Sequence, residues 1–136
     1  MLATCIYLIY KSNIKTRYGG KDMDCIFCKL ANGEIPTNMV YEDDKVAAFR
    51  DMSPVTPVHI LVVPKKHYAS LEDIPMEEMD IIADIHRAIR KIAAQEGFAD
   101  NGYRIINNCG KDGGQEVPHI HYHLLAGKPL TKLITD

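Results

Sequence analysis

Three histidines alternate with apolar or aromatic residues in the stretch Pro118-His119-Ile120-His121-Tyr122-His123-Leu124-Leu125. Side chains at every second position of a β-strand share one face, so the pattern predicts a strand over 118–125 with all three imidazoles on one surface. Their Cα atoms would lie roughly 6–7 Å apart along this strand. Histidine has an unperturbed pKa of about 6.5 and can act as nucleophile, proton carrier or metal ligand. Strict alternation of three histidines therefore predicts a functional surface rather than an ordinary half-polar sheet face.

The composition is that of an ordinary globular domain. The chain has 136 residues, of which 46% are hydrophobic and 25% charged, enough for one domain with its own core. A formal net charge of −2 gives no electrostatic reason to expect binding to nucleic acid or to an anionic membrane. The apolar run at residues 2–10 is far shorter than the roughly 20 residues of a membrane-spanning helix. Positive charges follow this run, whereas a signal peptide carries them in front.

Four cysteines are present, unevenly spaced and without a secretory signal, so we expect a reducing, cytoplasmic compartment. Cys25 and Cys28 form a C-x-x-C pattern, which in such a compartment indicates a metal knuckle or a redox pair. The stretch that begins at Met23 looks like the start of a protein, so Met23 is a candidate translation start. We therefore interpret residues 1–22 as an N-terminal extension and residues 23–136 as the functional domain.

Hydrophobic periodicity predicts an α+β fold. A short helix is expected over 25–32, closed by Gly33, and a long one over 75–96, where apolar residues recur at three- and four-residue spacing before Gly97. Short strands are expected at 40–41, 46–49, 59–63 and 103–107, in addition to the histidine strand. Paired strands without β-α-β alternation indicate an antiparallel sheet of about five strands with the helices to one side.

A glycine-rich stretch, residues 108–116, leads directly into the histidine strand. Glycines let backbone N–H groups approach an anion closely and form a nest for phosphate oxygens. Glycines are also common in hairpin connections, so the stretch by itself leaves both interpretations open. Its position immediately before three histidines favours a phosphate site beside a nucleophile.

The run Gly113-Gly114-Gln115-x-x-x-His119-x-His121-x-His123, followed by two apolar residues, resembles the signature of the histidine triad (HIT) family. Further matches lie at residues 25–28, 33–36, 48–54, 57–67 and 102–108, and the resemblance covers about residues 24–130. The chain is most similar to the branch of histidine triad nucleotide-binding proteins, whose members hydrolyse nucleoside phosphoramidates and related adenylates. The ending Leu125-Ala126-Gly127-Lys128-Pro129 favours this branch over the diadenosine-polyphosphate hydrolases.

The resemblance implies roles for the site residues. His121 would attack the α-phosphorus and form a nucleotidyl-histidine that water hydrolyses, while His123 and His59 stabilise the developing charge. Asn108 and the backbone of the loop would hold the phosphate and leaving group, the loop residues being Gly114, Gln115, Glu116 and Val117. Asp51 would bind the ribose hydroxyls of a purine nucleotide such as AMP or GMP. An apolar slot for the base would comprise Phe27, Leu30, Phe49 and Met52, although Phe27 and Phe49 suit plain core packing equally well.

Two residues depart from the pattern of this branch. Glu116 stands where a serine is frequent, so a hydroxyl contact to the leaving group is missing or is replaced by backbone. Pro118 takes a position that an aromatic residue frequently fills. We expect the first departure to affect the preference for leaving groups.

Cys25 and Cys28 form a Cys₂His₂ set with His67 and His119, a normal composition for a closed structural zinc site. Free thiols are the other interpretation. A redox C-x-x-C would follow a buried parallel strand, and none is evident. With zinc bound, His119 would be a metal ligand and not a catalytic acid.

Other functions remain open at this stage. The three triad histidines, with Glu116 nearby, have the residue types to hold a catalytic metal in a hydrolase or oxygenase. A nucleotide-binding regulator with incidental catalysis would use the same residues as the hydrolase. Within the family, dinucleoside polyphosphate hydrolysis is the alternative activity. The resemblance also implies a homodimer, for which the long helix and strand 103–107 supply surfaces.

Overall fold

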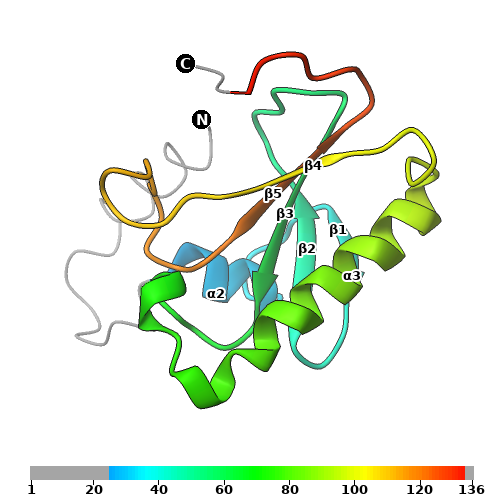
Figure 1. Ribbon diagram of the computed structural model, residues 1–136. Helices are drawn as coiled ribbons and strands as arrows, with labels where there is room; N and C mark the ends of the chain where they lie inside the picture. Colours follow the sequence, from blue (N-terminus) through cyan, green and yellow to red (C-terminus); the bar gives the residue numbers. More distant parts are fainter. Residues whose placement is uncertain (1–24, 134–136) are drawn as a thin grey trace.

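The computed structural model describes residues 25–133 (Figure 1). The expected extension over 1–22 lies outside these residues. Five strands form one antiparallel sheet in the order β1-β2-β3-β5-β4. The elements are α2 (Ile26–Ala31), β1 (Met39–Glu42), β2 (Val46–Arg50), β3 (Val58–Pro64), α3 (Asp80–Glu96), β4 (Arg104–Asn107) and β5 (Tyr122–Ala126). The predicted α+β fold, with one long and one short helix, is confirmed.

The two helices cover opposite faces of the sheet, so the expectation that both lie to one side is wrong. Ala48 and Ile60 belong to the core beneath α3, whereas their neighbours Phe49 and Leu61 belong to the core beneath α2. Successive side chains of a strand point to opposite faces. Because β2 and β3 are apolar at consecutive positions, both of their faces need a cover.

Helix α3 begins later than its apolar pattern predicts. Pro75 has an extended backbone and is followed by a 3₁₀ turn, Met76–Glu78, before the helix starts at Asp80. Its end is as expected: Gly97 has a φ of 83°, and its N–H donates to the carbonyl of Ala93 at 3.0 Å. A glycine adopts this left-handed conformation without a Cβ clash, which explains why the helix stops here.

The histidine strand is shorter than predicted. Strand β5 begins at Tyr122, and the two histidines before it lie outside the ladder. Pro118 has no N–H to contribute to a ladder, and the N–H of Ile120 donates instead to the carbonyl of Tyr68 at 2.8 Å. The alternation itself persists: Ile120 packs in the core beneath α3, while the rings of His119 and His121 contact Phe27 of α2.

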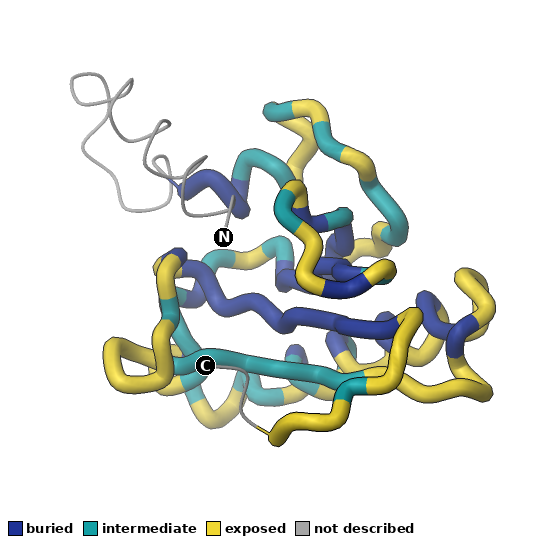
Figure 2. The backbone as a smooth tube through the Cα atoms, turned by 90° about the horizontal axis from the view of Figure 1, so that it is seen from above, coloured by how far each residue is buried: buried dark blue, intermediate teal, exposed yellow. Residues whose placement is uncertain are grey.

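Burial decreases from the centre of the sheet to one edge. Strand β5 is buried along its whole length, whereas β4, which forms an edge of the sheet, is only half-buried (Figure 2). None of the helices formed by residues 25–133 is long and apolar enough to cross a membrane.

Candidate functional site

The histidines of the alternating stretch have different partners. Nδ1 of His119 lies 3.3 Å from Sγ of Cys25. Nδ1 of His121 donates to the backbone carbonyl of His119 at 2.8 Å. Nδ1 of His123 lies 2.9 Å from Nε2 of His59, on the neighbouring strand β3. All four imidazoles are buried, and the rings of His121 and His123 are 5.1 Å apart.

The hydrogen bonds assign a tautomer to each neutral imidazole. The N–H of Val55 donates to Nδ1 of His59 at 3.2 Å, so His59 carries its proton on Nε2 and donates it to Nδ1 of His123. His123 therefore carries its proton on Nε2, a buried atom with no hydrogen-bond partner among the described residues. His121 has its proton on Nδ1, which leaves a lone pair on its Nε2. The site thus presents one nucleophilic nitrogen and one unsatisfied donor.

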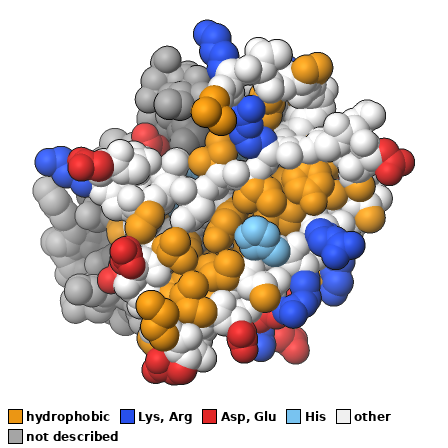
Figure 3. Space-filling view, viewed as in Figure 1, with side chains coloured by type: hydrophobic (Ala, Val, Ile, Leu, Met, Phe, Trp, Pro, Cys, Tyr) orange, Lys and Arg blue, Asp and Glu red, His pale blue; other side chains and the backbone are white. Residues whose placement is uncertain are grey.

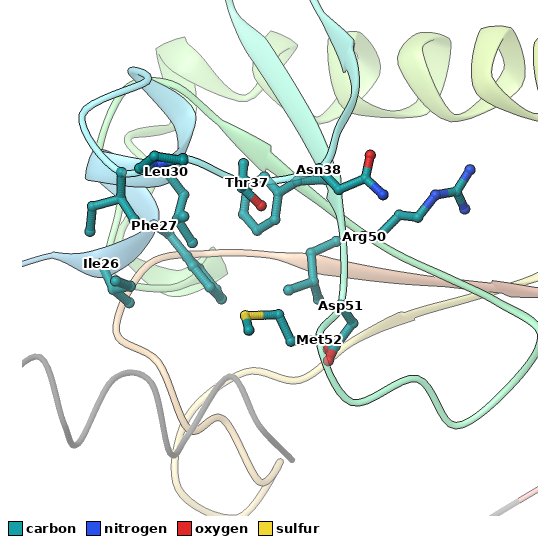
Figure 4. Close-up of a pocket in the computed structure, with 12 residues that line it drawn as sticks. Ile26, Phe27, Leu30, Thr37, Asn38, Arg50, Asp51 and Met52 are labelled. Atoms are coloured by element: carbon teal, nitrogen blue, oxygen red, sulfur yellow. The ribbon is translucent and has the colours of Figure 1, made fainter.

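A cavity of about 620 Å³ is lined by residues of α2, of β2 and of the segment before β1 (Figure 4). Its volume falls in the range of small-molecule sites, about 300–1,000 Å³. The ring of Phe27 lies 5.0 Å from the ring of His121, and Oδ2 of Asp51 lies 3.4 Å from Nε2 of His59. These two side chains connect the cavity to the imidazoles. All residues that the resemblance assigns to the base and ribose line this cavity: Phe27, Leu30, Phe49, Asp51 and Met52.

Sequence analysis missed the remaining lining residues. Residues 35–38, between α2 and β1, form one side of the cavity, and Ile26, Arg50 and Leu61 complete it. Leu61 pairs with Phe49 across β3 and β2, so the strand alternation contained a signal for it. Segment 35–38 has no chemical pattern that marks it; only the folding of the chain brings it to the cavity.

The glycine-rich stretch forms the loop between β4 and β5. At Gly113 a Cβ would lie 2.4 Å from the backbone oxygen of Cys109, so no larger residue fits without a shift of backbone. Gly114 has a φ of 78°, which also favours glycine. Asn108 is half-buried at the start of this loop, and Glu116 is exposed at its end.

The side chain of Gln115 braces this loop from within. Its Oε1 accepts the N–H of Gly110 at 2.9 Å, and its Nε2 donates to the carbonyls of Ala69 and Val117 at 2.6 and 2.9 Å. Val117 itself is buried in the core beneath α2. The Gln115 amide is therefore committed to holding the loop in place.

A family model described as HIT domain matches residues 32–130, which is most of the chain. The chain belongs to the HIT family. The resemblance recognised from the sequence is confirmed.

Individual relatives agree with this assignment. The chain is 45% identical over 111 residues to a purine nucleoside phosphoramidase of Escherichia coli (strain K12), covering 82% of this chain and 93% of that protein. A solved histidine triad protein from Clostridium difficile is 66% identical, with a TM-score of 0.81, and covers 82% of this chain and 97% of its own. A HIT family hydrolase from Legionella pneumophila Philadelphia 1 is 46% identical with a TM-score of 0.75, covering 79% and 96% of the two chains.

In this HIT domain, Cys25, Cys28, His67 and His119 lie close enough together to hold a metal ion. Nδ1 of His67 is 3.3 Å from Sγ of Cys28 and 3.2 Å from Nδ1 of His119. Ligand atoms around tetrahedral zinc lie about 3.3–3.8 Å apart, since Zn–S and Zn–N bonds are about 2.3 and 2.0–2.1 Å. Nε2 of His119 donates to the carbonyl of Pro64 at 2.9 Å, which leaves the Nδ1 lone pair facing the cluster. The four side chains fit a metal ion in number, type and spacing.

The charge state of Cys25 also suits a metal. Its Sγ caps the N-terminus of α2 and accepts the N–H of Cys28 at 3.4 Å. The pKa of Cys25 is lowered to about 3, and the side-chain hydrogen bond with Cys28 is the largest cause. Burial acts in the opposite direction and raises this pKa. A thiolate is the form of cysteine that binds metal.

The structure opposes a catalytic metal held by the triad histidines. His119 joins the cysteines, and Nδ1 of His121 is occupied by a backbone carbonyl. Asp51, His59 and His123 form a second close group, but the His59 nitrogen that faces the other two carries the proton. A protonated nitrogen has no lone pair for a metal.

Burial sets the charge state of the histidines. It lowers the pKa of His59 and of His121. Burial, together with the neighbouring His121 and His59, lowers the pKa of His123 to about 3. The folded protein therefore holds these imidazoles neutral at pH values where the unfolded chain, with histidine pKa values of about 6.5, takes up protons.

This difference predicts a loss of stability in acid. As the pH falls below about 6.5, the unfolded state binds protons that the folded state rejects, and the free energy of unfolding decreases by up to about 1.4 kcal/mol per pH unit for each such histidine. Urea denaturation between neutral pH and pH 5 measures this slope. His123→Asn should reduce it, whereas Ile92→Val, which removes no titratable group from α3, should not. An identical slope in wild type and His123→Asn would contradict the assignment.

Proposed function

We propose that this HIT domain, over residues 23–136, hydrolyses nucleoside 5′-phosphoramidates or related adenylates through a nucleotidyl-histidine intermediate. The observation that carries the proposal is the hydrogen bond from Nδ1 of His121 to the carbonyl of His119. It fixes a neutral imidazole with its other lone pair available for attack on phosphorus. The E. coli relative, a purine nucleoside phosphoramidase, supports the same class of substrate.

In the proposed first step, Nε2 of His121 attacks the α-phosphorus and the P–N bond to the leaving amine breaks. The amine takes up a proton from solvent, and the hydrolysis of the second step returns one proton to solvent. Water then cleaves the bond between phosphorus and His121, which releases the nucleoside monophosphate and restores the imidazole. Negative charge develops on the phosphoryl oxygens in both steps. The unsatisfied Nε2–H of His123 is a preorganised donor for this charge, and His59 holds His123 in the required tautomer.

The cavity is the proposed binding site of the nucleoside. Phe27, Phe49 and Met52 give it apolar walls for a purine base, as in AMP or GMP. Asp51 lies where the cavity meets the histidines, and its buried Oδ2 has no hydrogen-bond partner within residues 25–133. A ribose hydroxyl would supply the missing donor. Asn108 and the backbone of the glycine-rich loop would hold the phosphate on the other side.

Substitution of the nucleophile tests the mechanism. Loss of a single preorganised donor costs about 10²–10³ in kcat, so His123→Ala should fall in that range and His121→Ala, which removes the covalent path, should cost more. AMP binding to His121→Ala should persist because the cavity is intact. Rapid acid-free quenching with adenosine 5′-phosphoramidate labelled at phosphorus should trap an adduct on His121 in the wild type.

Two results would reject this mechanism: absence of any trapped adduct, and near-normal turnover by His121→Ala. A parallel assay with a diadenosine polyphosphate separates the phosphoramidase from the alternative activity within the family. A protein that binds AMP tightly and turns over neither substrate would instead be a nucleotide-binding regulator.

We further propose that the Cys₂His₂ cluster binds zinc, held by Cys25, Cys28, His67 and His119. A zinc ion at such a closed site contributes folding free energy. The short ligand separations and the outer hydrogen bond from His119 to Pro64 support this choice.

Cys25→Ser should therefore lower both the zinc content and the melting temperature of the protein, because it removes a thiolate ligand. Cys109→Ser is the matched control, since Cys109 lies in the glycine-rich loop outside the cluster. Elemental analysis and thermal unfolding measure the two effects. Equal zinc content in Cys25→Ser and wild type would refute the site.

A homodimer is the proposed assembly. Strand β4 is an edge of the sheet and is half-buried, and an unpaired edge strand is a ready pairing surface. Hydrophobic side chains gather beside α3 on the face seen in Figure 3. Tyr103, directly before β4, is 36% exposed, and Ile105, two residues further on, is only partly buried.

Sedimentation of the wild-type protein at micromolar concentration should give a dimer. Tyr103→Asp should weaken it by placing a charge in the apolar surface. Met76→Asp, at an exposed position before α3, serves as the control and should sediment as the wild type does. A monomeric wild type would refute the proposed dimer.

A further inference from the structure

His119 belongs to two arrangements at once. Its imidazole lies in the Cys₂His₂ cluster, with Nδ1 3.3 and 3.4 Å from the sulfur atoms of Cys25 and Cys28. Its backbone carbonyl accepts the Nδ1–H of His121 at 2.8 Å. The carbonyl that orients the proposed nucleophile thus belongs to a residue whose side chain is a cluster ligand.

The backbone between these two histidines is not held by the sheet. Strand β5 begins only at Tyr122, so the ladder does not fix the plane of the His119 carbonyl. A loop contact holds it instead: the N–H of Ile120 donates to the carbonyl of Tyr68 at 2.8 Å. Tyr68 directly follows His67, another ligand of the cluster. The peptide between His119 and Ile120 is therefore linked to the cluster twice, through the His119 side chain and through the chain neighbour of His67.

Helix α2 provides a second connection. Cys25 and Cys28 flank Phe27, whose ring lies 6.1 Å from the ring of His119 and 5.0 Å from that of His121. An α-helix of six residues is too short to be stable without tertiary contacts. Core contacts, such as that of Phe27 with Phe49, hold α2 as well, so its two cysteines are one of two anchors that keep Phe27 against the His121 ring.

We propose that the Cys₂His₂ cluster positions the nucleophile, with His119 as the positioning residue: when its imidazole is held in the metal-bound cluster, its carbonyl orients His121. The proposal rests on the assignment of His121 as nucleophile. It adds a role in turnover to the purely structural role expected of the zinc site. A misplacement of about 1 Å at a reacting group can cost about 10²-fold in rate, so a small change in this carbonyl has a large effect.

His67→Gln in the full-length protein is the test variant. It removes one ligand from the loop after β3 without altering His119, α2 or the cavity lining. Ile92→Val is the matched control for stability, because Ile92 is buried beneath α3 on the opposite face of the sheet. For both variants the measurements are zinc content, melting temperature, kcat with adenosine 5′-phosphoramidate, the dissociation constant for AMP, and the ¹⁵N NMR signal of the His121 Nδ1–H.

His67→Gln should lose zinc, lower kcat by about 10- to 100-fold and broaden or abolish the His121 Nδ1–H signal. Its AMP dissociation constant should change by less than about threefold, because the interaction lost acts on the transition state and not on nucleotide binding. Zinc-stripped wild type should behave in the same way and recover when Zn²⁺ is added. Ile92→Val should lower the melting temperature and leave kcat and the NMR signal unchanged.

The proposal is overturned if zinc-poor His67→Gln keeps the wild-type kcat and His121 signal, or if the wild type binds no Zn²⁺. A drop in kcat for Ile92→Val equal to that of His67→Gln overturns it as well, since the effect would then be general loosening. If the wild type does not hydrolyse the phosphoramidate, the proposed function fails. The His121 signal of the AMP complex, with and without zinc, still decides whether cluster and nucleophile are coupled.

Discussion

The hydrogen bond from Nδ1 of His121 to the carbonyl of His119 is the interaction on which the proposed chemistry of the site depends. It selects one tautomer and leaves the other nitrogen as a lone pair inside a buried site. Without it, the imidazole would be free to rotate and to exchange its proton between the two nitrogens. A second chain of hydrogen bonds, through His59 to His123, does the same for the neighbouring donor. Both sets of hydrogen bonds use backbone groups that lie outside the regular strands.

The sheet is covered on both faces, and the resulting burial of apolar side chains offsets the free-energy cost of the buried polar site. The core beneath α3 is extensive and includes Ile85, Ile89 and Ile92, which are fully buried. The core beneath α2 is smaller, and its Phe27 contacts the rings of His119 and His121. Neutral imidazoles avoid the cost of burying charge, and most of their nitrogens are hydrogen-bonded. One face of the sheet stabilises the fold, and the other holds the cavity and the cluster.

Much of the site followed from patterns in the chain. The alternation of histidines placed their side chains opposite Ile120, and the Cys₂His₂ composition named the four residues that lie together. Phe27, Leu30 and Met52, which the sequence analysis assigned to an apolar slot, all line the cavity. Segment 35–38 was missed because its part in the cavity comes from position alone. The sequence analysis assigned Gln115 to the phosphate-binding loop through its backbone, and the hydrogen bonds by which its side-chain amide holds that loop come only from the structure.

The sequence by itself determined the elements and the residue types of the site, because periodicity and chemical identity are local properties of a chain. It predicted the sheet, both helices and the glycine at the end of α3. Only the tertiary structure decided that the helices lie on opposite faces and that β5 starts after His121. Only it decided that the carbonyl of His119 accepts the Nδ1–H of His121. These are relations between segments distant in the chain, and packing and long-range hydrogen bonds select them.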